Sequence, residues 1–158
     1  MRNHRARLVA LAALGFLLAA PGAGDPPPPA MVDALLGGQR VRIPLASLAE
    51  RVPLAADQEF RVVELGRDAT TSHHAVAIRT AELPHRHDSH DLLVVIARGY
   101  GTMRIGDALE PVGEGSVVYV PRGTVHAFTN HSDLPAVSYA VYTPPFDGKD
   151  RVEVPFGR

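Results

Sequence analysis

Residues 115–130, GSVVYVPRGTVHAFTN, carry the most specific pattern in this chain. Two runs rich in β-branched and aromatic residues flank a turn formed by Pro121, Arg122 and Gly123. Proline presets the φ angle of a turn and ends the strand before it, and glycine adopts backbone angles that other residues resist. The stretch therefore predicts two short strands joined by a tight turn, with His126 at the start of the second strand.

Runs of the same kind recur along most of the chain. Between residues 60 and 142 they alternate with Gly, Pro, Asp and Asn, and this region has neither a helical stripe nor a fixed-period repeat. Seven or more short strands with frequent turn signals are typical of a β-sandwich or β-barrel, so the sequence predicts an all-β domain. The expected strands are Arg61–Leu65, His74–Thr80, Leu92–Ala97, Gly101–Ile105, Ser116–Val120, Val125–Thr129 and Val137–Tyr142.

The first 24 residues have the pattern of a secretory signal peptide. Arg2, Arg5 and Arg7 make a basic start, the uncharged apolar run Leu8–Ala20 follows, and small residues come after it. A membrane-spanning helix needs about 20 apolar residues, so the short run favours cleavage over the alternative of an uncleaved anchor. We expect an exported protein, periplasmic or secreted, with no stable membrane anchor after cleavage.

The rest of the chain is expected to form two further segments. Residues 25–56 read as a Pro-rich linker and N-terminal arm, and residues 57–158 as the barrel. Within the arm, Met31–Leu36 and Leu45–Arg51 are predicted to form short helical turns.

The charge of the exported part bears on its partners. Residues 1–24 carry three Arg and no acid, so 13 basic and 17 acidic residues remain, a net charge of −4. Binding of nucleic acid depends on basic residues that neutralise phosphates, and this chain has no Lys/Arg cluster, which argues against such a partner. The chain also lacks Cys, which excludes disulfides and the acylated Cys of a lipoprotein.

Three of the eight histidines have positions that suggest a metal site. His85 and His87 are two residues apart, so on a strand both imidazoles point to the same face. His126 follows the Pro-x-Gly turn directly. Neutral imidazole suits Fe, Mn, Cu, Ni and Zn, so the pattern indicates a divalent transition metal without selecting one. For any one histidine taken alone, a surface or core role is the alternative.

The quoted stretch matches the second motif of the cupin family, G-x5-P-x-G-x2-H-x3-N, at every fixed position. The first cupin motif contains a His-x-His pair, which segment Pro84–His87 supplies here, and Gly99 resembles its closing glycine. From about Val76 to Tyr142, the chain therefore resembles a small single-domain cupin.

This resemblance implies a fold and a ligand set. Cupins are double-stranded β-helix, or jelly-roll, barrels, and here an N-terminal extension would precede the barrel. By position in the motifs, His85, His87 and His126 would meet inside the barrel on one metal ion. The resemblance also implies a small-molecule ligand or substrate, and pairing into a homodimer.

The carboxylate ligand of the family has no clear counterpart in this chain. Counting back from Gly99 by the family spacing reaches Leu92, where the family has Glu and where leucine cannot bind a metal. Counting forward from His87 reaches Asp91, which would require a bulge, and His90 shares strand parity with Leu92. We expect three His ligands, with the fourth position open to Asp91, His90 or solvent. Asp91 could instead accept a hydrogen bond from a ligand imidazole.

Residues outside the motifs are weaker candidates. One of His73 and His74 should point inward if their strand is regular. Tyr139 and Arg104 are candidates for substrate contacts. The charged segment Pro144–Arg151 is expected to be a C-terminal arm that caps a strand, with a lid or a dimer contact as alternatives.

Two functions from different classes follow from the resemblance. Small cupins similar to this chain include dioxygenases that act on phenolic or dicarbonyl compounds, which implies a three-His, non-haem, dioxygenase-like enzyme. The alternative is a non-catalytic module that captures a metal or a small ligand in a concave, mostly apolar pocket. The sequence places no second carboxylate as a general base, which disfavours isomerase or epimerase chemistry.

Overall fold

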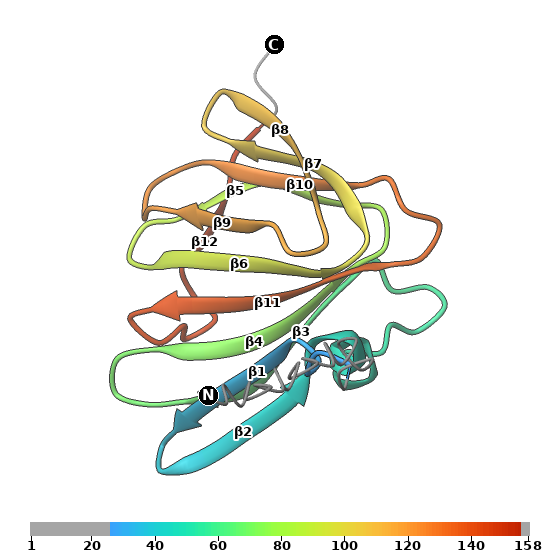
Figure 1. The fold of residues 1–158 in the computed structure, drawn as a ribbon. Helices are drawn as coiled ribbons and strands as arrows, with labels where there is room; N and C mark the ends of the chain where they lie inside the picture. The colour runs from blue at the N-terminus through green and yellow to red at the C-terminus, as the bar shows by residue number, and fades with distance from the viewer. Residues whose placement is uncertain (1–25, 156–158) are drawn as a thin grey trace, which may run out of the picture.

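The computed structural model describes residues 26–155, and the predicted signal peptide, residues 1–24, lies outside this range. Two five-stranded antiparallel sheets face each other and form a barrel (Figure 1). Strands that are distant in sequence pair within each sheet, and successive strands mostly alternate between the two sheets. This topology is that of a jelly roll, as predicted. The first sheet has the order β3(Phe60–Arg67), β4(Ser72–Ile78), β11(Ala136–Thr143), β6(Asp91–Arg98), β9(Val117–Val120). The second has the order β12(Arg151–Glu153), β5(Ala81–His87), β10(His126–Asn130), β7(Tyr100–Ile105), β8(Ala108–Gly113).

All seven stretches predicted as strands correspond to strands, with ends that shift by a few residues. Three strands of the barrel were not predicted: β5, β8 and β12. Pro84 lies inside β5 and Pro111 inside β8, and proline cannot donate a hydrogen bond to a sheet. The structure accommodates Pro111 because β8 is an edge strand, and Pro84 because it lies at an irregularity in the pairing of β5.

The N-terminal arm differs from the prediction in one element. Met31–Leu36 is not helical but forms strand β1, which pairs with β2(Gln39–Pro44) in a separate hairpin. Gly37 and Gly38 make the two-residue turn with φ values of 54° and 81°, the backbone that favours a tight hairpin. The predicted turn at Leu45–Arg51 is present as the 3₁₀ helix η1.

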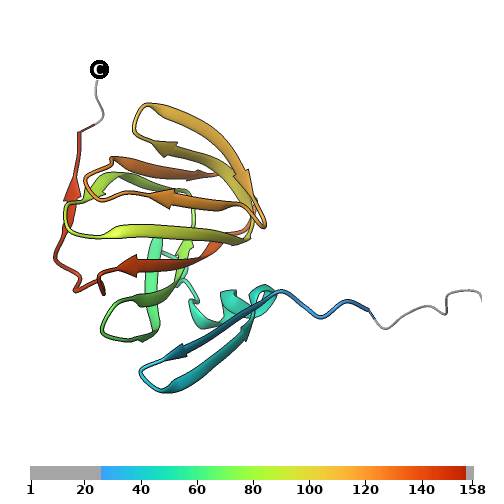
Figure 2. The same cartoon turned by 60° about the vertical axis from the view of Figure 1, so that its left-hand side comes forward.

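The arm packs on the outside of the first sheet. Its side chains Val32, Leu48 and Val52 form a cluster with Ala75 of β4 and Val137 of β11. Figure 2 shows the hairpin beneath the barrel and β12, in red, along the left edge of the barrel. Within residues 26–155, no helix has the length and the apolar character that crossing a bilayer requires.

A second cluster fills the space between the two sheets. Alternate residues of β4, β6 and β11 point inward, because side chains on a strand alternate between its two faces. The inner cluster consists of Val76, Ile78, Leu92, Met103, Val118, Val120, Phe128, Ala136, Ala140 and Tyr142.

Candidate metal centre

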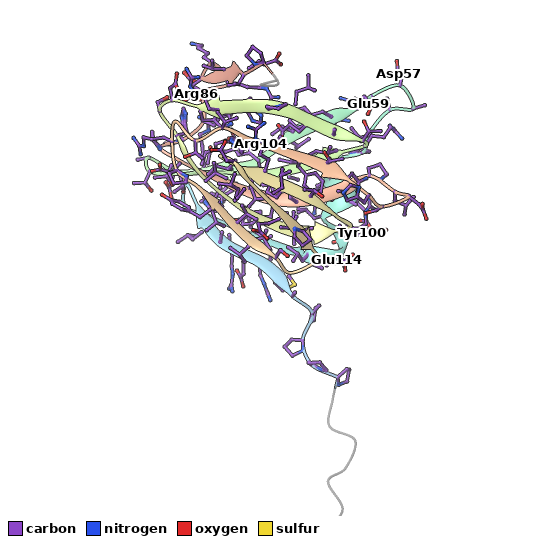
Figure 3. All side chains as sticks on the ribbon, turned by 90° about the horizontal axis from the view of Figure 1, so that it is seen from above. Asp57, Glu59, Arg86, Tyr100, Arg104 and Glu114 are labelled. Carbon is purple, nitrogen blue, oxygen red and sulfur yellow. The ribbon has the colours of Figure 1, made fainter. Side chains whose placement is uncertain are left out.

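The three predicted ligands meet inside the barrel. His85, His87 and His126 are all buried, and one nitrogen from each ring lies within 4.8 Å of the others. The ring centroids of His85 and His126 are 4.2 Å apart, and those of His85 and His87 are 5.1 Å apart. Viewed from above, Arg86 marks this end of the barrel, and Tyr100 and Glu114 mark the other (Figure 3).

Strand pairing brings the histidines together. His126 on β10 lies directly across from His85 on β5, and His87 is two residues further along the same face. The Pro-x-Gly turn before His126 is fixed by a 2.6 Å hydrogen bond from the Gly123 amide to the His87 carbonyl. Gly123 has a φ of 78°, which a residue with a side chain rarely adopts. The turn glycine is therefore needed to place the third imidazole beside the first two.

Hydrogen bonds fix which nitrogen of each ring faces the centre. The Nδ1 of His85 donates to the Leu83 carbonyl at 2.9 Å, and the Nδ1 of His126 donates to the Thr124 carbonyl at 3.1 Å. A carbonyl can only accept, so each Nδ1 carries the proton and each Nε2 keeps its lone pair. Metal-binding histidines have this arrangement, in which the second ring nitrogen donates to an outer oxygen.

His87 receives the same support from a carboxylate. Its Nδ1 donates to Oδ1 of Asp150 at 2.9 Å, so its Nε2 also remains free. Burial alone would raise the pKa of Asp150, but hydrogen bonds from Ser89 and two histidines outweigh it and hold that pKa well below its usual range. Asp150 therefore stays ionised and orients the imidazole of His87.

Burial keeps the rings of His85 and His126 neutral, as metal binding requires. Burial lowers the pKa of His85 to about 4, and it does the same for His126, although the nearby Glu82 carboxylate acts in the opposite direction on His126. The Nε2 of His126 is buried without a hydrogen-bond partner among the described residues. An unpaired buried nitrogen is costly, and a metal ion would satisfy it. The residues thus fit a divalent metal.

Acidification should destabilise the metal-free protein through these buried rings. Burial lowers the pKa of His74, His85 and His126 from 6.5 to about 4 in the folded state. Between pH 6.5 and about pH 4 the unfolded chain binds more protons than the folded protein does. The free energy of unfolding therefore decreases as the pH falls through this range. Each histidine contributes a slope of up to about 1.4 kcal/mol per pH unit.

Urea unfolding of the chelator-treated protein at several pH values measures this slope. His74→Leu removes one titrating ring without touching the three ligands, so this variant should lose stability less steeply below pH 6.5. Equal slopes in the two proteins would contradict a buried, neutral His74.

The two candidates for a fourth ligand have other partners. Oδ2 of Asp91 lies 2.7 Å from Nη2 of Arg122, and Oδ1 accepts from the Arg122 amide at 2.9 Å. His90 is buried, but its Nδ1 lies 2.6 Å from Oδ2 of Asp150 and its Nε2 lies 3.2 Å from the Pro145 carbonyl. Neither belongs to the converging group. Instead, Asp91 holds the Pro-x-Gly turn, and His90 helps to hold the C-terminal segment.

A cavity of about 50 Å³ adjoins the histidines. It has room for roughly three water molecules or a comparably small organic molecule. His85, His126, Glu82 and Ser138 supply polar atoms, and most of the remaining lining is apolar. Leu92 lines the same cavity, so the position that carries Glu in the family faces the site in this chain too.

Leu92→Glu is therefore expected to tighten metal binding. The new carboxylate would enter the cavity that His85 and His126 line, and we expect a gain of about tenfold, the lower end of what partners of a metal site contribute. Competition with a Zn²⁺ chelator measures the affinity. Leu93→Glu, on the same strand but at a neighbouring position outside the cavity lining, is the matched control. An unchanged affinity in Leu92→Glu would show that residue 92 does not reach the ion.

The candidates outside the cupin motifs lie partly inside the barrel and partly on its outer surface. His74 is buried, 5.2 Å from the Tyr142 ring between centroids, whereas His73 lies outside and pairs with the hydroxyl of Tyr139. Tyr139 packs with the N-terminal arm, and Arg104 bonds the Gly106 carbonyl. Neither side chain lines the cavity, so the structure does not support the predicted substrate contacts.

Sequence reasoning missed Asp150 and Glu82. Asp150 lies in the charged C-terminal segment, and only the pairing of β12 with β5 brings it to His87. Glu82 lies three residues before His85, and its Oε1 is 3.5 Å from Nε2 of His85. A carboxylate close to the His-x-His motif was the available signal for Glu82. In a regular strand, however, residues three apart point to opposite faces, which would turn Glu82 away from His85.

Several known proteins are similar to this chain. A protein from Aquifex aeolicus, described as uncharacterized, is 35% identical over 97 residues, which span 61% of this chain and 79% of that protein. A Klebsiella pneumoniae structure with a double-stranded β-helix domain has a TM-score of 0.57 at 16% identity, covering 68% of this chain and 96% of that one. The structure of Pac13 from Streptomyces, a nucleoside dehydratase, has a TM-score of 0.55 at 16% identity, covering 70% and 90%.

The family assignment rests on sequence and fold together. The model of the Cupin_2 family, described as a cupin domain, matches residues 72–142, which contain all three converging histidines. The solved structures are too distant in sequence to show more than the shared fold. This chain belongs to the cupin family.

Proposed function

We propose that this cupin binds one divalent transition metal ion through His85, His87 and His126, and that it acts as a dioxygenase-like enzyme on a small organic substrate. Fe, Mn, Zn, Cu and Ni are all compatible with three imidazoles, and iron or a similar redox-active ion suits the proposed reaction. The observation that carries the proposal is the convergence of one nitrogen from each of the three imidazoles. In each ring Nδ1 donates a hydrogen bond, which leaves Nε2 free to bind an ion.

The residues of the chain supply binding and orientation. A bound metal would offer Lewis acidity and open positions for a chelating substrate and O₂. The apolar lining would hold the body of the substrate and limit the entry of water. A mostly apolar cavity next to the histidines suits the apolar body of a small dicarbonyl or phenolic compound.

Oxygen uptake tests the proposed reaction. Protein loaded with Fe²⁺ would be mixed with a 1,3-dicarbonyl compound, a catechol or a flavonol, and O₂ consumption recorded with an electrode. We expect uptake that depends on both the iron and one of these substrate classes. His126→Ala mixed with the same amount of Fe²⁺ is the control for reactions of free iron.

The alternative is a non-catalytic binding module. It is favoured by Leu92, which places an apolar side chain in the cavity where the family has a carboxylate. Tight, stoichiometric Zn²⁺ or Cu²⁺ without O₂ uptake for any of the three substrate classes would support this module over the enzyme.

We also propose that the protein is exported. The support is the basic and apolar pattern of residues 1–24. Mass spectrometry of the mature protein from a periplasmic fraction should show a chain beginning near residue 25, and a full-length protein in the membrane fraction would contradict cleavage. A homodimer stays a prediction from the family resemblance.

A further inference from the structure

We propose that Glu82 supplies the carboxylate ligand that this cupin lacks at Leu92. The inference rests on the proposed metal site, and it concerns a position outside the family motif. Oε1 of Glu82 lies 3.5 Å from Nε2 of His85, the nitrogen left free to bind an ion. Two ligand atoms that are each about 2.1 Å from one ion lie roughly 3 to 3.5 Å apart, so this spacing fits an ion shared with His85. Like Asp91 and His90, Glu82 lies outside the group whose ligand atoms are all within 4.8 Å of one another, so its side chain would turn toward the ion on binding.

A local irregularity of β5 turns Glu82 inward. On β10, His126 and Phe128 are two residues apart, but their partners on β5, His85 and Glu82, are three residues apart. The extra residue is a bulge, which reverses the normal alternation and lets Glu82 share the face of His85. Both side chains accordingly line the same cavity.

The bulge also forms part of the ligand support. Its backbone places the Leu83 carbonyl where the Nδ1 of His85 donates to it at 2.9 Å. Pro84 is buried at the same irregularity, and its carbonyl accepts from the Val154 amide at 2.9 Å. The C-terminal segment therefore covers the bulge that orients both Glu82 and His85.

The surroundings of Glu82 resemble those of a metal-binding carboxylate. Its side chain is only 16% exposed, and its Oε1 accepts from Nη1 of Arg151 at 2.6 Å. A ligating carboxylate is typically held by an outer hydrogen bond, and each of its oxygens has a second lone pair available. Arg151 follows Asp150 directly, so consecutive residues support Glu82 and His87.

The simpler role for Glu82 is an ion pair that fastens β12 to β5, and matched variants separate the two roles. Glu82→Gln removes the ligand charge and the ion pair, whereas Arg151→Gln removes the ion pair and leaves the carboxylate. Cobalt(II) is the probe, because its visible absorption reports the coordination geometry while chelator competition gives the affinity. Circular dichroism confirms that each metal-free variant is folded.

We expect Glu82→Gln to weaken Co²⁺ binding at least tenfold and to change the visible spectrum, because a ligand is lost. Arg151→Gln should weaken binding less and leave the spectrum unchanged, because it removes only the outer partner of a carboxylate that remains. Adding Leu92→Glu to Glu82→Gln should recover part of the affinity, because residue 92 lines the same cavity. If Glu82→Gln does not fold, Glu82→Asp keeps the charge but draws the carboxylate back, and it should also weaken binding.

Three results would overturn the inference. Unchanged affinity and spectrum in the folded Glu82 variant, with a wild type that binds Co²⁺, would remove Glu82 from the site and leave the three-His centre standing. The same loss of affinity and the same spectral change in Glu82→Gln and Arg151→Gln would assign the effect to the ion pair. A wild type that binds no Co²⁺ would defeat the proposed metal function itself.

Discussion

Replacing His126 with alanine is expected to abolish stoichiometric metal binding while the barrel remains folded. The substitution removes one of three converging nitrogens. Loss of even an outer hydrogen-bond partner of a ligand lowers metal affinity by about 10- to 100-fold, so loss of the ligand itself should lower it by more than about 100-fold. The metal-free fold should tolerate the change, because it also removes a buried nitrogen that has no partner among the described residues. Metal analysis of the purified variant measures the result.

A second histidine substitution controls for general effects. His131→Ala changes an exposed ring that follows β10 and bonds the Thr102 hydroxyl, away from the three ligands, so it should keep one metal per chain. His85→Ala should behave like His126→Ala. Full metal content in both His85→Ala and His126→Ala would defeat the assignment of the site.

Asp150→Asn is expected to weaken metal binding by about 10- to 100-fold without removing a ligand. The carboxylate accepts from Nδ1 of His87 at 2.9 Å and from Nδ1 of His90 at 2.6 Å. The negative charge of the carboxylate orients the His87 ring and makes that ring more basic. An amide in its place lacks this charge. Titration with Zn²⁺ in the presence of a competing chelator measures the affinity.

Asp88→Asn tests whether charge alone explains such a loss. Asp88 lies next to His87 in the sequence, but its exposed carboxylate pairs with Arg86 and touches no imidazole of the centre. This variant should bind Zn²⁺ as the wild type does. The positioning role of Asp150 fails if the two variants lose affinity to the same extent, or if Asp150→Asn loses none.

The second cupin motif made the site partly predictable. Its Pro-x-Gly turn is a local feature, because Pro121 restricts its own φ angle and Gly123 permits the positive φ that the turn uses. The position of His126 follows from that turn. Likewise, spacing alone places His85 and His87 on one face of a strand.

The rest of the centre depends on pairing between distant segments. Asp150 reaches His87 only because β12 pairs with β5, and three residues in β12 give too little pattern to predict a strand. Glu82 reaches His85 only because β5 has a bulge, which inverts the face that a regular strand predicts. These contacts arise from tertiary structure, so local propensity does not reveal them.

The N-terminal arm illustrates the same limit in the fold. Met31–Leu36 has apolar residues that suit either a helical turn or a strand, and the prediction of a helix was wrong. The Gly37-Gly38 pair was the available signal, since two glycines between short apolar runs favour a hairpin. Packing of Val32 against the outer face of the first sheet then stabilises the strand.

Anomalous X-ray diffraction from crystals grown with Zn²⁺ tests the central claim most directly. A metal held by three neutral imidazoles should give one strong peak inside the barrel, about 2.0 to 2.1 Å from the Nε2 atoms of His85, His87 and His126. A map with no peak between these rings, or with zinc bound only elsewhere on the chain, would contradict the account.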